Sequence, residues 1–169
     1  MLFSRYSWIS ALAAAALLTG CGSPAPYHYT YVPGKTAVVQ SGYAVVPESA
    51  PRRVRAAIEA GNQIAGLPYR RGGGHGQLHD TAYDCSGATS FVLRQAGLLE
   101  TAIPSTSFRR YGEKGEGDWI SVYARKGHVF LVVAGLRFDT GYGNGAKGPQ
   151  WTTHDRPATG CVIRHPEGM

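Results

Sequence analysis

The chain has 169 residues, of which 43% are hydrophobic, so it is long enough to bury the core of one domain. Its 23 glycines and 10 prolines argue against a helical bundle and favour a loop-rich α+β domain. A formal net charge of +6 suits an anionic partner such as nucleic acid, anionic lipid or an acidic polymer. The cellular compartment determines which of these the protein can meet.

The first twenty residues have the pattern of a secretory signal peptide. Arg5 is the only charged residue before Lys35, and residues 9–18 are nearly all alanine and leucine. This apolar stretch is well short of the roughly 20 residues that a membrane-spanning helix needs. We therefore expect residues 1–20 to direct export and not to form a permanent membrane span.

The signal pattern ends in Leu18-Thr19-Gly20-Cys21, which resembles the lipobox of bacterial lipoproteins. The resemblance implies cleavage before Cys21 and acylation of that residue, and several acyl chains would hold the chain firmly on a membrane. Gly22 instead of aspartate follows the cysteine, which by the same resemblance favours the outer membrane and a periplasm-facing lipoprotein. An ordinary signal peptide with a chance cysteine is the alternative.

The domain proper is predicted at residues 51–169. Residues 21–50 predict a lipidated cysteine and a Pro/Tyr-rich tether with one weak strand, which holds the domain away from the lipid. A helix is predicted from Pro51 to about Ala65, because apolar residues recur on one of its faces. The glycine-rich residues 66–76 that follow predict a loop.

A second helix is predicted from Cys85 to Ala96, with Asp84 as its N-cap. The remainder predicts strands at residues 119–123, 128–134 and 136–139 and a last one near 160–164. Helices followed by antiparallel strands predict an α+β fold, in which the helix that starts at Cys85 packs on the sheet.

Cys85 is the strongest candidate for a reactive side chain. It lies in the first turn of a predicted helix, where unpaired backbone N–H groups favour a thiolate. The helix terminus alone usually lowers the pKa of a thiol too little to make it reactive, so a nearby imidazole must provide the remaining stabilisation of the thiolate. His128 begins an otherwise apolar strand and is the best candidate, although a lone histidine in such a strand is more often structural.

The other cysteine of the domain offers a simpler alternative. Cys85 and Cys161 could form one disulfide in an oxidising periplasm. The residues around Cys161 instead predict a small, buried, apolar side chain in a strand. We therefore expect two free thiols.

The residues around these two positions resemble the NlpC superfamily of papain-like cell-wall cysteine peptidases. The matching segments are Gly66-Leu67-Pro68-Tyr69-Arg70, Asp84-Cys85-Ser86-Gly87 and Gly127-His128-Val129. The resemblance implies a papain-like domain with Cys85 as nucleophile, His128 as base, and peptidoglycan stem peptides as substrate. It further implies that Tyr69 lines the site, and we assign Asp84 and Ser86 with it to the substrate and oxyanion side.

The resemblance also implies a third polar residue, on the strand after the histidine, that orients the imidazole. Asp139 and Thr140 are both candidates, and His154 is a further one. We choose Asp139, because a carboxylate both fixes the tautomer and stabilises an imidazolium.

No cofactor, metal or nucleic acid is expected. His75, His79, Asp80 and Asp84 have some features of a metal site, but the glycines at 72–76 make helical ligand spacing improbable. Two other functions stay open at this point. One is a non-catalytic peptidoglycan-binding lipoprotein, and the other is an acyltransferase or amidase on another envelope substrate. The oligomeric state and the bond cut are left open.

Overall fold

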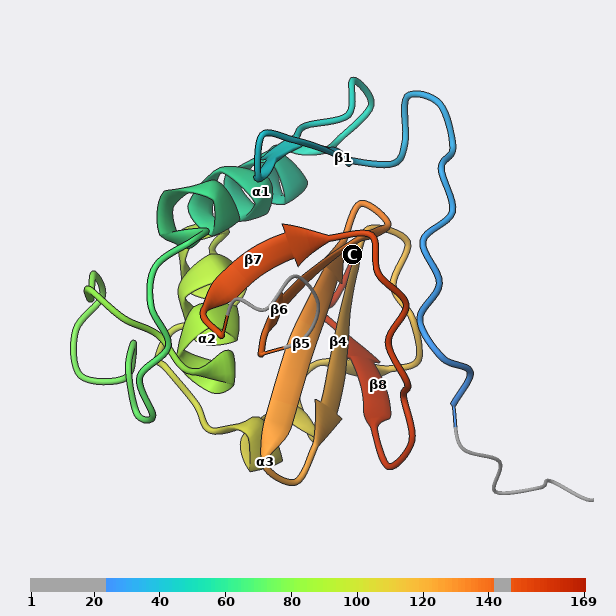
Figure 1. Ribbon diagram of the computed structural model, residues 1–169. Helices are drawn as coiled ribbons and strands as arrows, with labels where there is room; N and C mark the ends of the chain where they lie inside the picture. Colours follow the sequence, from blue (N-terminus) through green and yellow to red (C-terminus); the bar gives the residue numbers. More distant parts are fainter. Residues whose placement is uncertain (1–23, 142–146) are drawn as a thin grey trace, which may run out of the picture.

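The computed structural model of the chain describes residues 24–141 and 147–169 (Figure 1). The predicted signal peptide and the lipidation at Cys21 therefore lie outside the described residues. Within the described ranges, no helix is long and apolar enough to cross a membrane.

Two long helices form one layer of the molecule. Helix α1 spans Arg52–Ile64 and helix α2 spans Cys85–Gln95, within two residues of the predicted ranges. A single turn of helix, α3, spans Ser105–Phe108 and was not predicted. α1 packs on α2 and reaches the sheet where Gly61 meets the Trp151 ring, an approach that leaves no room for a Cβ at residue 61.

A six-stranded antiparallel sheet forms the second layer, in the order β3-β8-β4-β5-β6-β7. Its strands are β3 Glu113–Lys114, β4 Ile120–Arg125, β5 His128–Val133, β6 Leu136–Thr140, β7 Pro149–Thr152 and β8 Val162–His165. The α+β prediction is confirmed, with the helices on one side of the sheet (Figure 1). The sequence pattern missed β3 and β7, because both are short and β7 begins with a proline.

The two faces of the sheet bury different kinds of side chain. Along β5, Val129 and Leu131 pack in the apolar core shared with the helices. Since side chains alternate along a strand, His128 and Phe130 belong to the opposite face. Phe130 lies there in a small second cluster with Tyr27 and Cys161. The sheet is thus covered on both faces, and the second cover is not helical.

The segment before α1 corrects the predicted tether. Tyr27 is buried and exchanges two backbone hydrogen bonds with Arg156, of 2.9 and 3.0 Å. Ala37 is fully buried, and its N–H donates to the carbonyl of Ala134 at 2.8 Å. Aromatic side chains of the predicted tether thus pack on the face of the sheet that the helices leave open. The folded unit begins by Tyr27, and the predicted boundary at residue 51 lies inside it.

The same segment also forms a hairpin in place of one weak strand. β1 (Val38–Gln40) pairs with β2 (Tyr43–Val45) across Ser41 and Gly42. Both turn residues have positive φ, as a two-residue type I′ turn requires. The Asn62 amide of α1 accepts from the Ala44 N–H and donates to its carbonyl, both at 2.9 Å, which fixes the hairpin to the helix.

Candidate active site

Cys85 is the first residue of α2, and its surroundings fix the start of that helix. Asp84 precedes it in an extended conformation and accepts a hydrogen bond from the Gly87 N–H at 2.7 Å. The Ala88 N–H is bonded to the Asp84 carbonyl. The N–H groups of Cys85 and Ser86 have no intrahelical acceptor, as at every helix start. The predicted cap is confirmed, and the sulfur lies beside the positive end of the helix.

His128 meets Cys85 at the beginning of β5. The strand follows a two-residue connection, Lys126-Gly127, in which Gly127 adopts a positive φ. The His128 side chain is hydrogen-bonded to Cys85, and both residues line one cleft of about 320 Å³. The structure therefore brings together two side chains that are 43 positions apart in the sequence.

Asp139 completes the group because of the register between β5 and β6. A two-residue turn, Ala134-Gly135, pairs Val133 with Leu136 and Leu131 with Phe138. Both turn residues have positive φ, typical of a type I′ turn. Continuing this register puts Asp139 opposite Phe130, on the same face as His128. The His128 Nε2 atom lies 2.8 Å from the Asp139 Oδ1 atom.

The other two candidates for the third position are placed differently. Thr140 lies one residue further along β6, so its side chain belongs to the opposite face, and its backbone N–H donates to Asp139 Oδ1 at 2.7 Å. His154 is exposed, and its carbonyl accepts from Arg137 Nη1 at 2.7 Å. Of the three, Asp139 is the residue whose side chain is hydrogen-bonded to His128.

Asp139 is buried between two arginines. Its side chain has no exposed surface, and its Oδ2 atom lies 3.6 Å from Arg137 Nε and 3.5 Å from Arg156 Nη1. Burying a carboxylate costs several kcal/mol unless charges and hydrogen bonds compensate for it. The two guanidinium groups, the Thr140 N–H and the His128 imidazole supply that compensation.

These contacts set the charge of His128. Burial of the ring acts to lower its pKa, but the hydrogen bonds to Asp139 and Cys85 and their electrostatic attraction raise the pKa of His128 to about 9. The imidazole is therefore protonated at neutral pH. An imidazolium beside a sulfur at a helix start stabilises a thiolate.

Tyr69 lies on the rim of the same cleft, as the sequence predicts. It is 45% exposed and joins Tyr83 through an isolated parallel bridge. Burial, together with the charges of Cys85 and Asp84, raises the pKa of Tyr69, so the phenol stays protonated and can donate a hydrogen bond. A second cleft of about 360 Å³ adjoins it, and Tyr69 and Lys147 line both.

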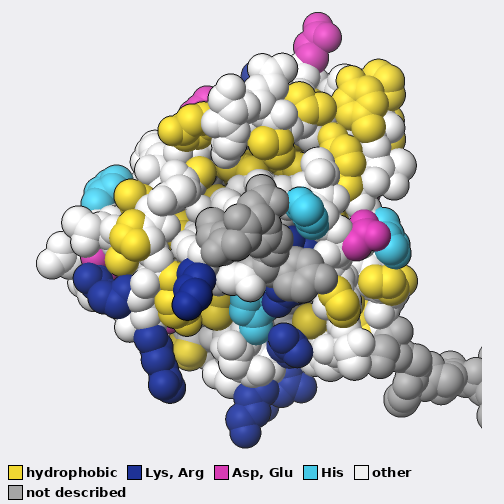
Figure 2. Space-filling view, viewed as in Figure 1, with side chains coloured by type: hydrophobic (Ala, Val, Ile, Leu, Met, Phe, Trp, Pro, Cys, Tyr) yellow, Lys and Arg dark blue, Asp and Glu magenta, His cyan; other side chains and the backbone are white. Residues whose placement is uncertain are grey.

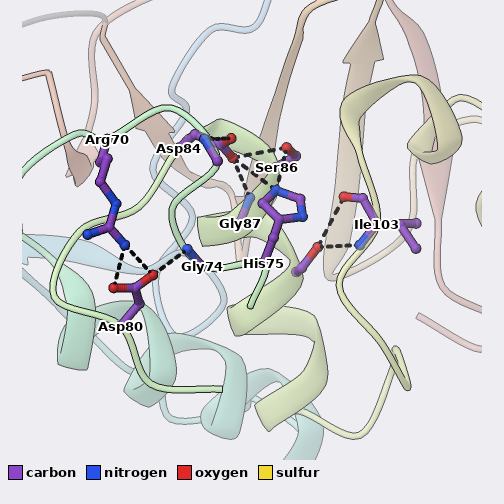
Figure 3. A network of polar contacts seen from close by, with 10 residues as sticks. Arg70, Gly74, His75, Asp80, Asp84, Ser86, Gly87 and Ile103 are labelled. Carbon is purple, nitrogen blue, oxygen red and sulfur yellow. Dashed lines mark hydrogen bonds and ion pairs between the residues drawn. The ribbon is translucent and has the colours of Figure 1, made fainter. Parts of the chain in front are cut away.

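Asp84 and Ser86, assigned from the sequence to the substrate and oxyanion side, make side-chain hydrogen bonds within the glycine-rich loop and the start of α2. Asp84 accepts from the Gly72 N–H at 2.8 Å, and its Oδ1 atom lies 3.0 Å from Ser86 Oγ and 3.2 Å from His75 Nε2. Figure 3 shows this network. Neither residue is among those that line the cleft beside Cys85. Their side chains join the glycine-rich loop to the start of α2.

The glycine-rich loop is held by a second carboxylate. Asp80 accepts from Arg70 Nη2 at 2.6 and 2.7 Å and from the Gly74 N–H at 3.0 Å (Figure 3). Backbone N–H groups and Arg70 hold the pKa of Asp80 at about 2. Within the described ranges, no three His, Cys, Asp or Glu side chains are grouped so as to hold a metal ion. Cys85 and Cys161 are both free thiols.

Two cationic residues of the cleft were missed by the sequence reading. Arg156 and Lys147 both line it, and both follow β6, where the pattern gave little guidance. Lys and Arg side chains gather in the lower half of the face seen in Figure 2. The sequence gives no sign of their role, because the burial of Arg156 is visible only in the folded structure.

Comparisons with known proteins give the following results. No protein-family model and no curated protein matches the chain. Among solved structures, it is similar to a hypothetical invasion protein of Mycobacterium tuberculosis, at 19% identity over 78% of this chain and 72% of that one, with a TM-score of 0.47. It is also similar to two mutants of the Resuscitation Promoting Factor Interacting protein RipA, with the same identity and coverage and a TM-score of 0.48.

Proposed function

We propose that the protein is a cysteine hydrolase of the cell envelope that cleaves amide bonds in peptidoglycan stem peptides through a thioester intermediate. The observation that carries this proposal is the continuous contact from Cys85 to His128 to Asp139, at the edge of one open cleft. A thiol at a helix start, a charged imidazole and a buried carboxylate have the chemistry that acyl transfer needs.

In the first step the Cys85 thiolate attacks the amide carbonyl, and a carbon–sulfur bond forms. The negative charge moves to the carbonyl oxygen, to which the backbone N–H of Cys85 can donate a hydrogen bond. The Tyr69 phenol, protonated beside the same sulfur, is the second donor. Collapse of this intermediate breaks the carbon–nitrogen bond, and the leaving amine takes the proton of the His128 imidazolium.

In the second step water hydrolyses the thioester. The now neutral imidazole takes a proton from water as the oxygen attacks the acyl carbon. The carbon–sulfur bond breaks, the thiolate and the imidazolium are restored, and the carboxylic acid leaves. The task of Asp139, which lies beside Arg137 and Arg156, is to orient and stabilise the imidazolium.

The choice of peptidoglycan rests on the resemblance of the Tyr69, Cys85 and His128 segments to wall peptidases and on the predicted export. A cleft with the Lys147 ammonium group in its wall suits a peptide that carries a carboxylate. If Cys21 carries lipid, six residue steps separate it from Tyr27, which reach at most about 20 Å. The site would then work close to the membrane surface.

The test is digestion of defined muropeptides with the products identified by mass spectrometry. We expect one amide bond to be cut by the unaltered protein and none by Cys85→Ala, with an unchanged thermal transition in that variant. Cys161→Ala is the matched control for the loss of a thiol and should keep most of the activity, since that sulfur does not line the cleft. Cleavage that survives in Cys85→Ala would refute the proposal.

A further inference from the structure

The face of the sheet that carries His128 and Asp139 is covered by two segments far apart in the sequence. One is residues 24–36, which we call the N-terminal strap, and the other is residues 153–161 after β7. They are joined by the two backbone hydrogen bonds between Tyr27 and Arg156. The catalytic face is thus closed from behind by the part of the chain that lies nearest to the predicted anchor.

Arg156 is where this cover touches the reacting groups. Its Nη1 atom lies 3.5 Å from Asp139 Oδ2, its guanidinium lies 5.7 Å from the centre of the Phe130 ring, and it lines the cleft together with Cys85. The side chain is 10% exposed. A cation that is buried to this degree beside a buried carboxylate has a defined position, because moving it away would leave a buried charge without its partner.

The two oxygens of Asp139 have different partners. Oδ1 lies within hydrogen-bond distance of His128 Nε2 and the Thr140 N–H, while Oδ2 faces the guanidinium groups of Arg137 and Arg156. Rotation about the Cβ–Cγ bond would break the hydrogen bonds of Oδ1 and move Oδ2 away from the two guanidinium groups. The ion pairs of Oδ2 therefore help to keep Oδ1 directed at His128.

The strap holds Arg156 at its main chain. Tyr27 is buried, its hydroxyl donates to the Gly135 carbonyl at 2.8 Å, and its ring lies 5.9 Å from the Arg137 guanidinium carbon. Arg137 in turn donates to the carbonyls of His154 and Asp155 at 2.7 and 3.0 Å. Each arginine beside Asp139 is therefore tied to the strap, one through its backbone and one through a ring.

We propose that Arg156 is a positioning residue for the hydrolase reaction and that the N-terminal strap, by holding Arg156, is a working part of the catalytic site. The inference rests on the proposed function, since it names what keeps Asp139 in place for His128. Arg156 acts through Asp139 and is not itself a catalytic residue. Outer partners that orient a reacting side chain typically contribute 10- to 100-fold.

The first experiment compares Arg156→Gln and Arg156→Lys with Arg53→Gln, a matched change at an exposed arginine of α1. We expect Arg156→Gln to lower kcat about 10- to 100-fold, with KM changed less than threefold. Arg156→Lys should recover part of the loss, and the control should match the unaltered protein. Unchanged kcat in Arg156→Gln would overturn the proposal. If the glutamine variant does not fold, the lysine variant decides alone, since a point charge without the planar fork should still lose activity.

The second readout separates positioning from simple electrostatics and needs no substrate. Removing a positive charge near His128 without any loss of geometry would raise the pKa of the imidazole. Loss of the Asp139 orientation would instead lower it. We expect NMR titration of His128 to give a lower pKa in Arg156→Gln than in the unaltered protein, and a higher or equal value would overturn the positioning role. Because this measurement does not depend on cleavage, it remains decisive if no muropeptide is cut.

The strap is tested at Tyr27. Tyr27→Pro removes the N–H that donates to Arg156, whereas Tyr27→Phe removes only the hydroxyl bond to Gly135. We expect Tyr27→Pro to reproduce the loss of kcat and the lowered pKa of His128, and Tyr27→Phe to keep most of the activity. A Tyr27→Pro protein with normal kcat and a normal His128 titration would remove the strap from the site.

Discussion

Replacing Asp139 by asparagine gives the sharpest quantitative prediction. The pKa of His128 is about 9 against an ordinary value of 6.5, a difference of about 3 kcal/mol at 1.36 kcal/mol per unit. Asparagine keeps the shape but removes the charge, so Cys85 alone then opposes the effect of burial, and the pKa of His128 should fall toward its ordinary value. At pH 7 the imidazolium fraction would drop well below its present value of about 99%. We expect kcat to fall 100-fold or more.

The same change alters how stability depends on pH. A raised folded-state pKa stabilises the fold fully below pH 6.5, and this contribution is lost as the pH rises through 9. Urea unfolding at pH 6 and pH 9.5 should therefore show a stability difference between the unaltered protein and Asp139→Asn that shrinks by about 3 kcal/mol at the higher pH. Asp155→Asn, at an exposed ion pair with His28, is the control and should shift stability by less than about 1 kcal/mol at either pH. If the stability difference between the unaltered protein and Asp139→Asn is the same at both pH values, Asp139 is not the cause of the raised pKa of His128.

Three further predictions follow from single contacts. Muropeptide hydrolysis should lose activity as the pH rises through about 9, where His128 gives up its proton, and a pH–rate profile that still rises above pH 10 would contradict the imidazolium role. Gly87→Ala should lower the free energy of unfolding by about 1–3 kcal/mol, because a Cβ there would overlap the Gly73 carbonyl oxygen, whereas Gly76→Ala meets no atom within 4 Å and should be neutral in the same denaturation experiment. Tyr69→Phe should lower kcat about tenfold if its hydroxyl holds the oxyanion, and steady-state kinetics in which only KM rises would assign it to substrate binding instead.

Much of the site could be predicted because its signals are local. Asp84 before Cys85 is a helix cap with a direct physical meaning, and the structure confirms that cap. The apolar run after His128 predicts a strand that begins at that residue, and β5 begins there. These features depend on neighbours within a few positions, where sequence patterns carry most information.

The choice among third residues could not be made from the sequence, because it depends on one turn. A connection one residue longer than Ala134-Gly135 would have brought Thr140, not Asp139, to the face of His128. Positive φ at both turn residues fixes the two-residue form, and an alanine in that conformation is uncommon. The register of two strands is set by the turn that joins them and cannot be inferred from either strand alone.

The sequence also could not predict which segments cover the second face of the sheet. Residues 24–36 are rich in proline and tyrosine, which fits an extended spacer as well as a packed strap. The deciding feature is an apolar surface more than 80 residues later in the sequence, made by Tyr123 of β4, Phe130 of β5 and Cys161 just before β8. The composition of a segment does not indicate whether the rest of the fold offers a surface on which that segment can pack.

The most direct test of the central claim is detection of the thioester itself. Protein mixed with a cleavable muropeptide, quenched in acid and analysed by mass spectrometry should carry an acyl adduct, and peptide mapping should locate it on Cys85. Arg156→Gln should form the same adduct more slowly. Product released with no adduct at any time point, or an adduct on Cys161, would contradict the account.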